Sequence, residues 1–345
     1  MGPQSKALLL VLSGEHPTLP YSEALAILDS EGVHYREIGR FEQIFLIDAP
    51  EGCERVLQER AAYVMEGGRF LFRSAPSKED FTRACKAFDW GYLEGRSFGA
   101  KVTRVRDFWG TVDTQELQGL LGAAILASTD SKVDLKNPDV WIRGVVTDGG
   151  IFAFSMGLRT DRKAFGKRKP KSRPFFHPGV LEPKIARAFV NLSGARAGER
   201  FLDPFCGTGG FLIESALMGC ATFGMDLDIR MVRGAKANLH HYSLEAEVVR
   251  GDAKSLPFSR LDAVATDPPY GRGTWTGGQD VRALLSKFLH NAGDSLKAGG
   301  KICTAAPQEL NPSEVAWKAG LTVLEEHSMR VHKSLTRSVI VAKRD

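Results

Sequence analysis

Apolar and polar positions from residue 181 onward follow the two periods that distinguish helices from strands. A helix is predicted over 181–193, because Ile185, Ala188, Phe189 and Leu192 recur at the spacing of one helical face. Strands and helices then alternate: strands RFLD, ATFGMD, AEVVRG, LDAVATD and KICTAA, and helices at 209–218, 228–240 and 280–297. Two long strands, 321–331 and 335–343, close the chain as a hairpin. This alternation predicts a doubly wound, mostly parallel α/β sheet into which the hairpin inserts one antiparallel strand.

The N-terminal half interleaves strands and helices less regularly. Strands are predicted at 7–12, 44–47, 69–72, 100–106, 140–146 and 151–156, and helices at 21–31, 78–88 and 114–127. No glycine-rich nucleotide loop occurs in this half, so we expect an α+β binding region. Residues 159–174 are polar, contain Gly166, Pro170 and Pro174, and have neither period, which is typical of a linker.

Charge is concentrated in that predicted linker. The whole chain has a net charge of +5, yet residues 159–173 hold eight basic residues and one acid, so the remainder is slightly acidic. Such a block is typical of a segment that contacts a polyanion or of a solvated tail, and its place inside the chain weakens the second reading. Lys167, Arg168 and Lys169 are its candidate phosphate contacts, and a flexible spacer is the alternative.

Composition narrows the class of protein. Hydrophobic residues make up 43% and charged residues 25% of the chain, and no apolar run approaches the ~20 residues that span a bilayer. The run ALLLVL is short for a signal peptide and predicts a first strand, so we expect a cytoplasmic protein. The five cysteines form no CxxC pair, which argues against a metal site and fits a reducing compartment.

The stretch FLDPFCGTGGF contains the first candidate ligand site. A strand runs into Asp203, then into a glycine-rich loop and a helix, an order that lets the backbone approach a ligand closely. Asp226 ends the next strand 23 residues later, about the interval at which an acid meets ribose hydroxyls. The dinucleotide pattern GxGxxG is not met, and the Asp203 carboxylate suits an ammonium better than a pyrophosphate. Asp252 follows the third strand, where it could accept a hydrogen bond from an adenine amino group.

The stretch ATDPPYGRG, at the end of a predicted buried strand, contains the second candidate ligand site. An exocyclic base amine is a poor nucleophile because its lone pair is delocalised into the ring. Two acceptors aimed at its N–H groups favour the tetrahedral form. The Asp267 carboxylate and the Pro268 carbonyl can be those acceptors, on a backbone that the prolines hold rigid. Tyr270 offers a flat face for an extruded base, and Arg272 could reach a phosphate.

In order and spacing, DPFCGTGG, Asp226, GDA and DPPY resemble the motifs of Rossmann-type S-adenosylmethionine-dependent methyltransferases, over most of residues 175–345. The resemblance implies a Rossmann-like seven-stranded methyltransferase sheet with one antiparallel strand, and S-adenosyl-L-methionine as cofactor. The cofactor contacts that it implies are His177, Asp203, Phe205, Cys206, Gly207, Thr208, Gly209, Asp226, Leu227, Asp252 and Ala253. The residues that it places at the amine and its substrate are Asp267, Pro268, Pro269, Tyr270 and Arg272.

The segment LQGLLGAAILASTDSKVDLKNPDVWIRGVV resembles the THUMP domain of several tRNA-modifying enzymes. Just upstream, KVTRVR would place Arg104 and Arg106 on one strand face, where they contact phosphate or are simply solvated. We therefore expect an N-terminal lobe at 1–60, a THUMP domain at 61–158, the basic linker at 159–174 and the methyltransferase domain at 175–345.

A THUMP domain before DPPYG, with RPFFHPGVLEPKIARAFVNLSG between them, is similar to the archaeal tRNA guanosine-N2-methyltransferases. The resemblance implies methylation of N2 of a tRNA guanosine, at position ten, to the mono- and dimethylated products. It leaves open another guanosine of tRNA or ribosomal RNA, and less favourably a DNA base amine. A small zinc-binding activator subunit, required by some relatives, is a second partner to test beside tRNA. An NAD-dependent oxidoreductase and a non-enzymatic RNA-binding protein fit the glycine pattern and the retained acids less well.

Overall fold

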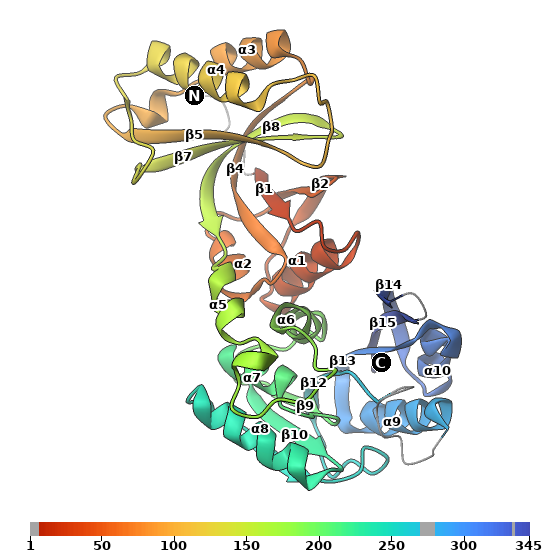
Figure 1. Cartoon of the computed structure of the whole chain (residues 1–345). Coiled ribbons are helices and arrows are strands. Elements are labelled where there is room, and N and C mark those ends of the chain that lie inside the picture. Colours follow the sequence, from red (N-terminus) through yellow and green to blue (C-terminus); the bar gives the residue numbers. More distant parts are fainter. Residues whose placement is uncertain (1–6, 270–279, 333–334) are drawn as a thin grey trace. The chain divides into compact units, whose positions relative to one another are not determined.

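The computed structural model describes residues 7–269, 280–332 and 335–345, which form two compact units (Figure 1). The second unit contains Thr18–Gly32, Arg60–Tyr63 and Asp161–Asp345, and the first contains the rest. The chain therefore enters the second unit three times, and two short N-terminal segments belong to the C-terminal fold. The boundaries expected at residues 60, 158 and 174 stay a prediction.

The first unit is an eight-stranded mixed sheet in the order β2-β3-β1-β4-β8-β7-β5-β6. Its strands are β1 (Ala7–Leu12), β2 (Arg36–Phe41), β3 (Ile44–Asp48), β4 (Val64–Ser74), β5 (Ser97–Arg104), β6 (Lys132–Val133), β7 (Val140–Thr147) and β8 (Gly150–Arg159). Its helices are α2 (Glu54–Arg60), α3 (Lys78–Ala87) and α4 (Thr114–Ser128). β1 is buried along its whole length because it lies between β3 and β4, which explains its uninterrupted apolar run. The pair α3 and α4 covers β5 over a core that includes Phe81, Phe98 and Leu121 (Figure 1).

Two details of the sequence prediction are wrong in this part of the chain. β5 ends at Arg104, and Arg106 adopts a left-handed backbone with φ of 46°, so the two arginines do not share a strand face. The segment expected to lack periodicity contains the short helix α5 (Arg162–Lys167) and a 3-10 turn at Pro170–Ser172. The side chain of Asp161 caps α5 by accepting from the Lys163 N–H at 3.0 Å, a capping signal that the basic composition obscured.

The second unit is a seven-stranded sheet, the number of strands that was predicted. Its strand order is β11-β10-β9-β12-β13-β15-β14. Its strands are β9 (Arg200–Asp203), β10 (Ala221–Asp226), β11 (Glu247–Arg250), β12 (Leu261–Thr266), β13 (Leu296–Pro307), β14 (Thr322–His332) and β15 (Leu335–Lys343). Its helices are α1 (Leu19–Ser30), α5, α6 (Pro183–Leu192), α7 (Gly210–Leu217), α8 (Ile229–His241), α9 (Val281–Ser295) and α10 (Pro312–Lys318). β15 is antiparallel to both of its neighbours, and the other pairs described in this sheet are parallel. The predicted single antiparallel strand is confirmed.

Both faces of this sheet are covered, so successive strand residues enter opposite cores. Phe201 packs with Phe189 of α6, while the adjacent Leu202 packs with Phe288 of α9. In β13 the same alternation places Cys303 in the core with Phe189 and the adjacent Ile302 in the core with Phe288. Burial on both sides accounts for strands that read as continuous apolar runs rather than as alternating ones.

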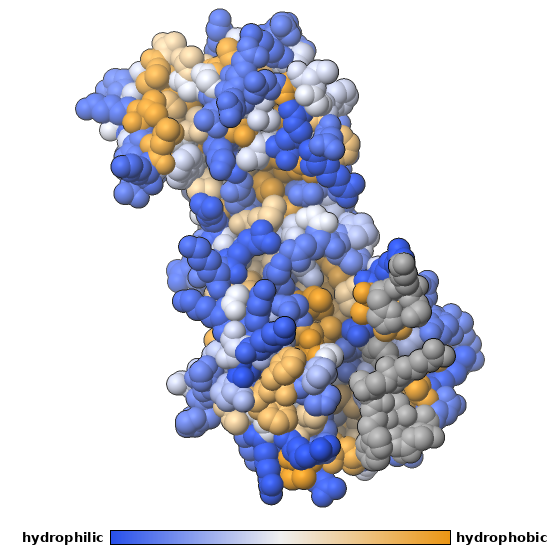
Figure 2. Space-filling view, in the orientation of Figure 1, coloured by the Kyte–Doolittle hydropathy of each residue, from blue (hydrophilic) through white to orange (hydrophobic). Residues whose placement is uncertain are grey.

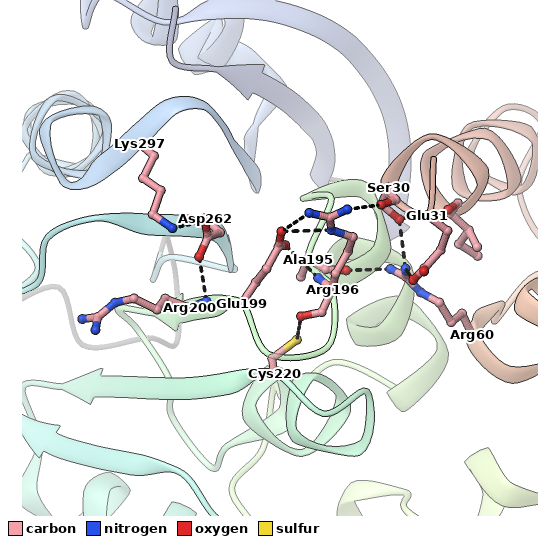
Figure 3. A network of polar contacts seen from close by, with 11 residues as sticks. Ser30, Glu31, Arg60, Ala195, Arg196, Glu199, Arg200, Cys220, Asp262 and Lys297 are labelled. Atoms are coloured by element: carbon pink, nitrogen blue, oxygen red, sulfur yellow. Dashed lines mark hydrogen bonds and ion pairs between the residues drawn. The ribbon is translucent and has the colours of Figure 1, made fainter. Parts of the chain in front are cut away.

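The two N-terminal segments of the second unit are joined to α6 by buried polar contacts. The Glu23 carboxylate of α1 accepts from the N–H groups of Ala62 and Tyr63 at 2.9 and 2.8 Å, and from the Asn191 amide at 2.8 Å. The Arg60 guanidinium donates to the carbonyl of Ala195 at 2.7 Å and also meets Glu31 (Figure 3). These partners offset the cost of burying the Glu23 carboxylate and the two Arg60 Nη groups, so the segments are an integral part of this fold.

Candidate active site

The carboxyl ends of β9, β10 and β12 meet at one edge of the second sheet. The strand order changes direction between β9 and β12, and such switch points are where open α/β sheets bind ligands. Asp203 ends β9, Asp226 ends β10, and Asp267 directly follows β12. A cavity of about 1200 Å³ opens at this edge, and both Asp226 and Asp267 line it. The fold therefore brings together acids that the sequence spreads over more than sixty residues.

The glycine-rich loop forms one wall of this cavity. Gly207 and Gly209 both have positive φ, 49° and 84°, a region that favours glycine. A Cβ on Gly209 would also lie 3.3 Å from the Cβ of Ala235 in α8. The Gly207 N–H donates to the Asp226 carboxylate at 2.9 Å, so Asp226 helps to hold the glycine-rich loop in place.

Asp226 and Asp252 lie on the part of the cavity expected to meet a nucleoside. The other Asp226 oxygen accepts from the Asp228 N–H at 2.9 Å, and burial raises the pKa of this carboxyl above its usual value. Each carboxylate oxygen has two lone pairs, so both can still accept from ribose hydroxyls. Asp252 accepts from the Lys254 N–H at 3.0 Å and lines the cavity. Leu227, 47% exposed, and the buried Ala253 line it as well.

Asp203 lies behind the cavity wall. Its carboxyl is fully buried and accepts from the Thr266 hydroxyl at 2.6 Å and from the Phe205 N–H at 3.2 Å. Among the described residues, none donates to its Oδ2 atom. Burial, with smaller contributions from the charges of Asp226 and Asp267, raises the pKa of Asp203 to about 8. The sequence identified the acid and could not show that its carboxyl group is desolvated.

The remaining predicted cofactor residues surround the same space. The cavity lining includes His177, Phe205, Cys206, Gly207 and Thr208. Burial raises the pKa of the Cys206 thiol well above its ordinary value, which fits a packing role rather than a nucleophilic one. The glycine loop, Asp226 and Asp252 fit a ligand with a ribose and an adenine, whereas Asp203, expected at the ammonium, is buried outside the cavity lining. A ribose and an adenine are groups of S-adenosylmethionine.

Residues 267–269, the DPP turn, line the same cavity. Asp267 is 15% exposed, Pro268 is buried, and Pro269 is half-buried, and all three line the cavity. The predictions for Tyr270 and Arg272 lie outside the described residues. Arg337 of β15, which sequence reasoning missed, donates from Nη1 to Asp267 Oδ2 at 3.2 Å and also lines the cavity. The predicted C-terminal hairpin could have indicated Arg337. Its second strand is antiparallel, so the start of that strand lies at the carboxyl edge of the parallel strands, where the site is.

The predicted phosphate-binding arginines have partners within the protein. Arg104 donates to the backbone carbonyls of Phe108, Trp109 and Val112, and Arg106 pairs with Glu42 at 2.6 Å. The Arg168 guanidinium pairs with the fully buried Glu214, with its Nε 2.8 Å from one carboxylate oxygen. Four linker lysines are exposed on or beside α5: Lys163, Lys167, Lys169 and Lys171.

Comparisons with known proteins agree with this architecture. Residues 170–339 match the RMKL-like methyltransferase domain family, and residues 75–152 match the THUMP domain. The crystal structure of TrmN from Thermus thermophilus covers 98% of this chain and all of its own, with a TM-score of 0.55 at 23% identity, a likeness of fold. The fold and the site thus define a methyltransferase that carries a THUMP domain.

Two archaeal relatives identify the family. The chain is 39% identical over 339 residues to the tRNA (guanine(10)-N2)-dimethyltransferase of Methanothermobacter thermautotrophicus, covering 98% of this chain and 99% of the relative. It is 31% identical to the enzyme of the same name from Methanocaldococcus jannaschii, over 97% and 99% of the two chains. The chain belongs to the tRNA (guanine(10)-N2)-dimethyltransferase family, which confirms the resemblance drawn from its motifs.

Proposed function

We propose that the protein transfers methyl groups from S-adenosyl-L-methionine to N2 of the guanosine at position ten of tRNA, giving the mono- and then the dimethylated nucleoside. The observation that carries this proposal is the DPP turn facing the same cavity as the glycine loop and Asp226. That arrangement puts an acceptor for an amine in the same cavity as a site for the methyl donor. The names of the two archaeal relatives support the choice of nucleoside.

The residues of this chain divide the work between binding and activation. When bound, S-adenosylmethionine supplies a methyl group that its sulfonium makes electrophilic. The Gly207 loop, Asp226 and Asp252 would hold it, through backbone approach and through acceptors for its hydroxyls and amino group. The Asp267 carboxylate and the Pro268 carbonyl would accept the two N–H groups of the guanosine amine, so that the nitrogen lone pair leaves the ring system. The amine proton displaced by methylation can pass through Asp267 to solvent.

In a second methylation only one of the two acceptors would still receive a hydrogen bond from the amine. After the first transfer one N–H remains on the amine, so one of the two acceptors loses its partner. The Asp267 carboxylate is the stronger acceptor because a charged group makes the stronger hydrogen bond. We expect it to hold the remaining proton while the Pro268 carbonyl faces the first methyl group.

The tRNA backbone would be held in part by the linker lysines. They are exposed, whereas Arg168 is engaged by Glu214, and the surface around α5 is largely hydrophilic (Figure 2). Lysine ammonium groups on such a surface neutralise phosphates without reading sequence. A cytoplasmic site of action follows from a tRNA substrate. Among the described residues, every helix is too short or too polar to cross a bilayer.

The test is methylation of tRNA transcripts by the purified chain with labelled S-adenosylmethionine. One transcript retains guanosine at position ten, a second carries adenosine there, and a third carries inosine, which lacks the N2 amine. We expect N2-methylated guanosine, identified by mass spectrometry, from the first transcript alone. Equal labelling of all three would move the target to another nucleotide. Activity of the chain by itself would also exclude a required zinc-binding activator subunit.

A further inference from the structure

We propose that Arg337 is a positioning residue that orients the Asp267 carboxylate for the target amine. The inference deepens the proposed function and rests on it. Arg337 Nη1 lies 3.2 Å from Asp267 Oδ2. Both side chains are largely shielded, 12% exposed for the arginine and 15% for the aspartate, and both line the cavity. A charge-assisted contact at this burial restricts rotation of the carboxylate, which an isolated side chain at a strand end would otherwise retain.

The position of Arg337 follows from the topology of the sheet. β12 pairs with β13 so that Thr266 lies opposite Thr304, and β13 pairs with β15 so that Thr304 lies opposite Ile340. Because β15 is antiparallel, residues that precede Ile340 extend past the carboxyl end of β12. Arg337 lies three residues before Ile340, opposite Pro307, so it reaches the level of the DPP turn from the side. The one antiparallel strand thus supplies a side chain from a direction unavailable to the parallel strands.

The charges around the site explain how the contact between Arg337 and Asp267 can affect the reaction. The charges of Asp226 and Asp267 both help to raise the pKa of the buried Asp203, so the strand-end acids lie close enough for their charges to matter. Mutual repulsion favours proton uptake, and a protonated carboxyl offers fewer acceptor sites. A guanidinium cation beside a carboxylate favours its ionised form, which for Asp267 is the form that accepts from an amine.

A double-mutant cycle distinguishes positioning of Asp267 by Arg337 from direct binding of the tRNA by Arg337. If Arg337 acts through Asp267, then Arg337→Met lowers kcat in the wild-type background and has little further effect in an Asp267→Ala background. If Arg337 binds the tRNA itself, the loss persists in both backgrounds and falls mainly on KM. A merely structural role would lower the affinity for S-adenosylhomocysteine and the melting temperature together.

The experiment measures kcat and KM for tRNA, and the Kd for S-adenosylhomocysteine by calorimetry. We expect Arg337→Met to lower kcat by on the order of 10- to 100-fold, the cost of misplacing a reacting group, with KM and Kd within about 3-fold of wild type. Arg337→Lys should restore part of kcat because it returns the charge without the planar fork. Arg330→Met, a matched charge change at an exposed position of β14, should leave all three values near wild type.

Wild-type kcat in Arg337→Met, or an undiminished loss in the Asp267→Ala background, would overturn the positioning role. A wild-type protein that methylates no tRNA would instead overturn the proposed function, so the two failures are distinguishable. If Arg337→Met does not fold, as shown by lost S-adenosylhomocysteine binding, the kcat of Arg337→Lys decides: a value equal to wild type would show that orientation by the fork is unnecessary.

Discussion

The buried carboxyl of Asp203 should make the stability of this protein fall as the pH rises, and Asp203→Asn should remove that effect. Burial raises the pKa of Asp203 from 3.8 to about 8 in the folded state. Between those values the folded protein holds a proton that the unfolded chain has lost. The unfolded state therefore binds fewer protons, and the free energy of unfolding decreases by about 1.4 kcal/mol per pH unit. The contribution is fully present below pH ~4 and is lost progressively toward pH ~8.

The variant keeps the shape of the group and removes its titration. The asparagine carbonyl oxygen can still accept from the Thr266 hydroxyl and the Phe205 N–H. Its amide nitrogen would take the place of the oxygen that has no described donor, which costs about 1–3 kcal/mol at every pH if it finds no acceptor. That constant offset cancels when the slopes of the two proteins are compared. By pH 7 the accumulated difference is on the order of 4 kcal/mol in favour of the variant, before the offset.

The assay is urea unfolding at pH 5, 6, 7 and 8, with the free energy of unfolding of the variant minus that of wild type plotted against pH. We expect a line that rises by about 1.4 kcal/mol per unit and flattens near pH 8. Asp139→Asn is the control. Hydrogen bonds from the N–H and hydroxyl of Ser97 lower the pKa of Asp139, so this group is ionised in both states and its difference plot should be flat. A flat plot for Asp203→Asn would show that the carboxyl is ionised in the folded protein, and the reasoning from desolvation would be refuted.

Three further results are expected. Asp226→Ala should weaken S-adenosylmethionine binding by ~1.5–3 kcal/mol, the worth of hydrogen bonds to a charged group, and unchanged calorimetric affinity in a folded variant would remove Asp226 from the site. Asp267→Ala should lower kcat far more than it weakens cofactor or tRNA binding, and near-normal turnover at saturating tRNA would contradict its role as acceptor. Replacing the linker lysines with serine while keeping Arg168 should reduce the log–log salt dependence of tRNA binding by about 3 units, with parallel slopes indicating a spacer.

Much of the fold, and the positions of two acids that line the cavity, could be predicted because their signals are local in sequence. Asp226 and Asp267 follow short apolar runs, and parallel strands bring such positions to one edge. β2 was not predicted because REIGRF is largely exposed and polar, and it pairs along only one edge, with β3. A strand whose stability comes from its partner leaves little trace in its own residues.

Two of the missed contacts depend on partners distant in sequence. Nothing near Arg168 shows that its guanidinium meets Glu214, and nothing near Asp267 indicates Arg337, 70 residues later. The basic residues suggested phosphate contacts. In the fold, Arg104 donates to backbone carbonyls and Arg168 pairs with Glu214 instead. A charge count reports which ions are present and cannot report which of them the protein itself neutralises.

The interleaved path of the chain restricts how this enzyme is made and how it can evolve. Every residue of the first unit precedes residue 161, so its sheet can form while the C-terminal part is still being synthesised. The second unit must wait for its last strands, and it then recruits α1 and Arg60–Tyr63, which left the ribosome long before. Recombination that exchanged only residues 161–345 would leave Glu23 and Asn191 facing foreign partners, at ~1–3 kcal/mol for each buried group left unpaired. We therefore expect the catalytic half to be inherited together with Thr18–Gly32 and Arg60–Tyr63 and not as a separable cassette.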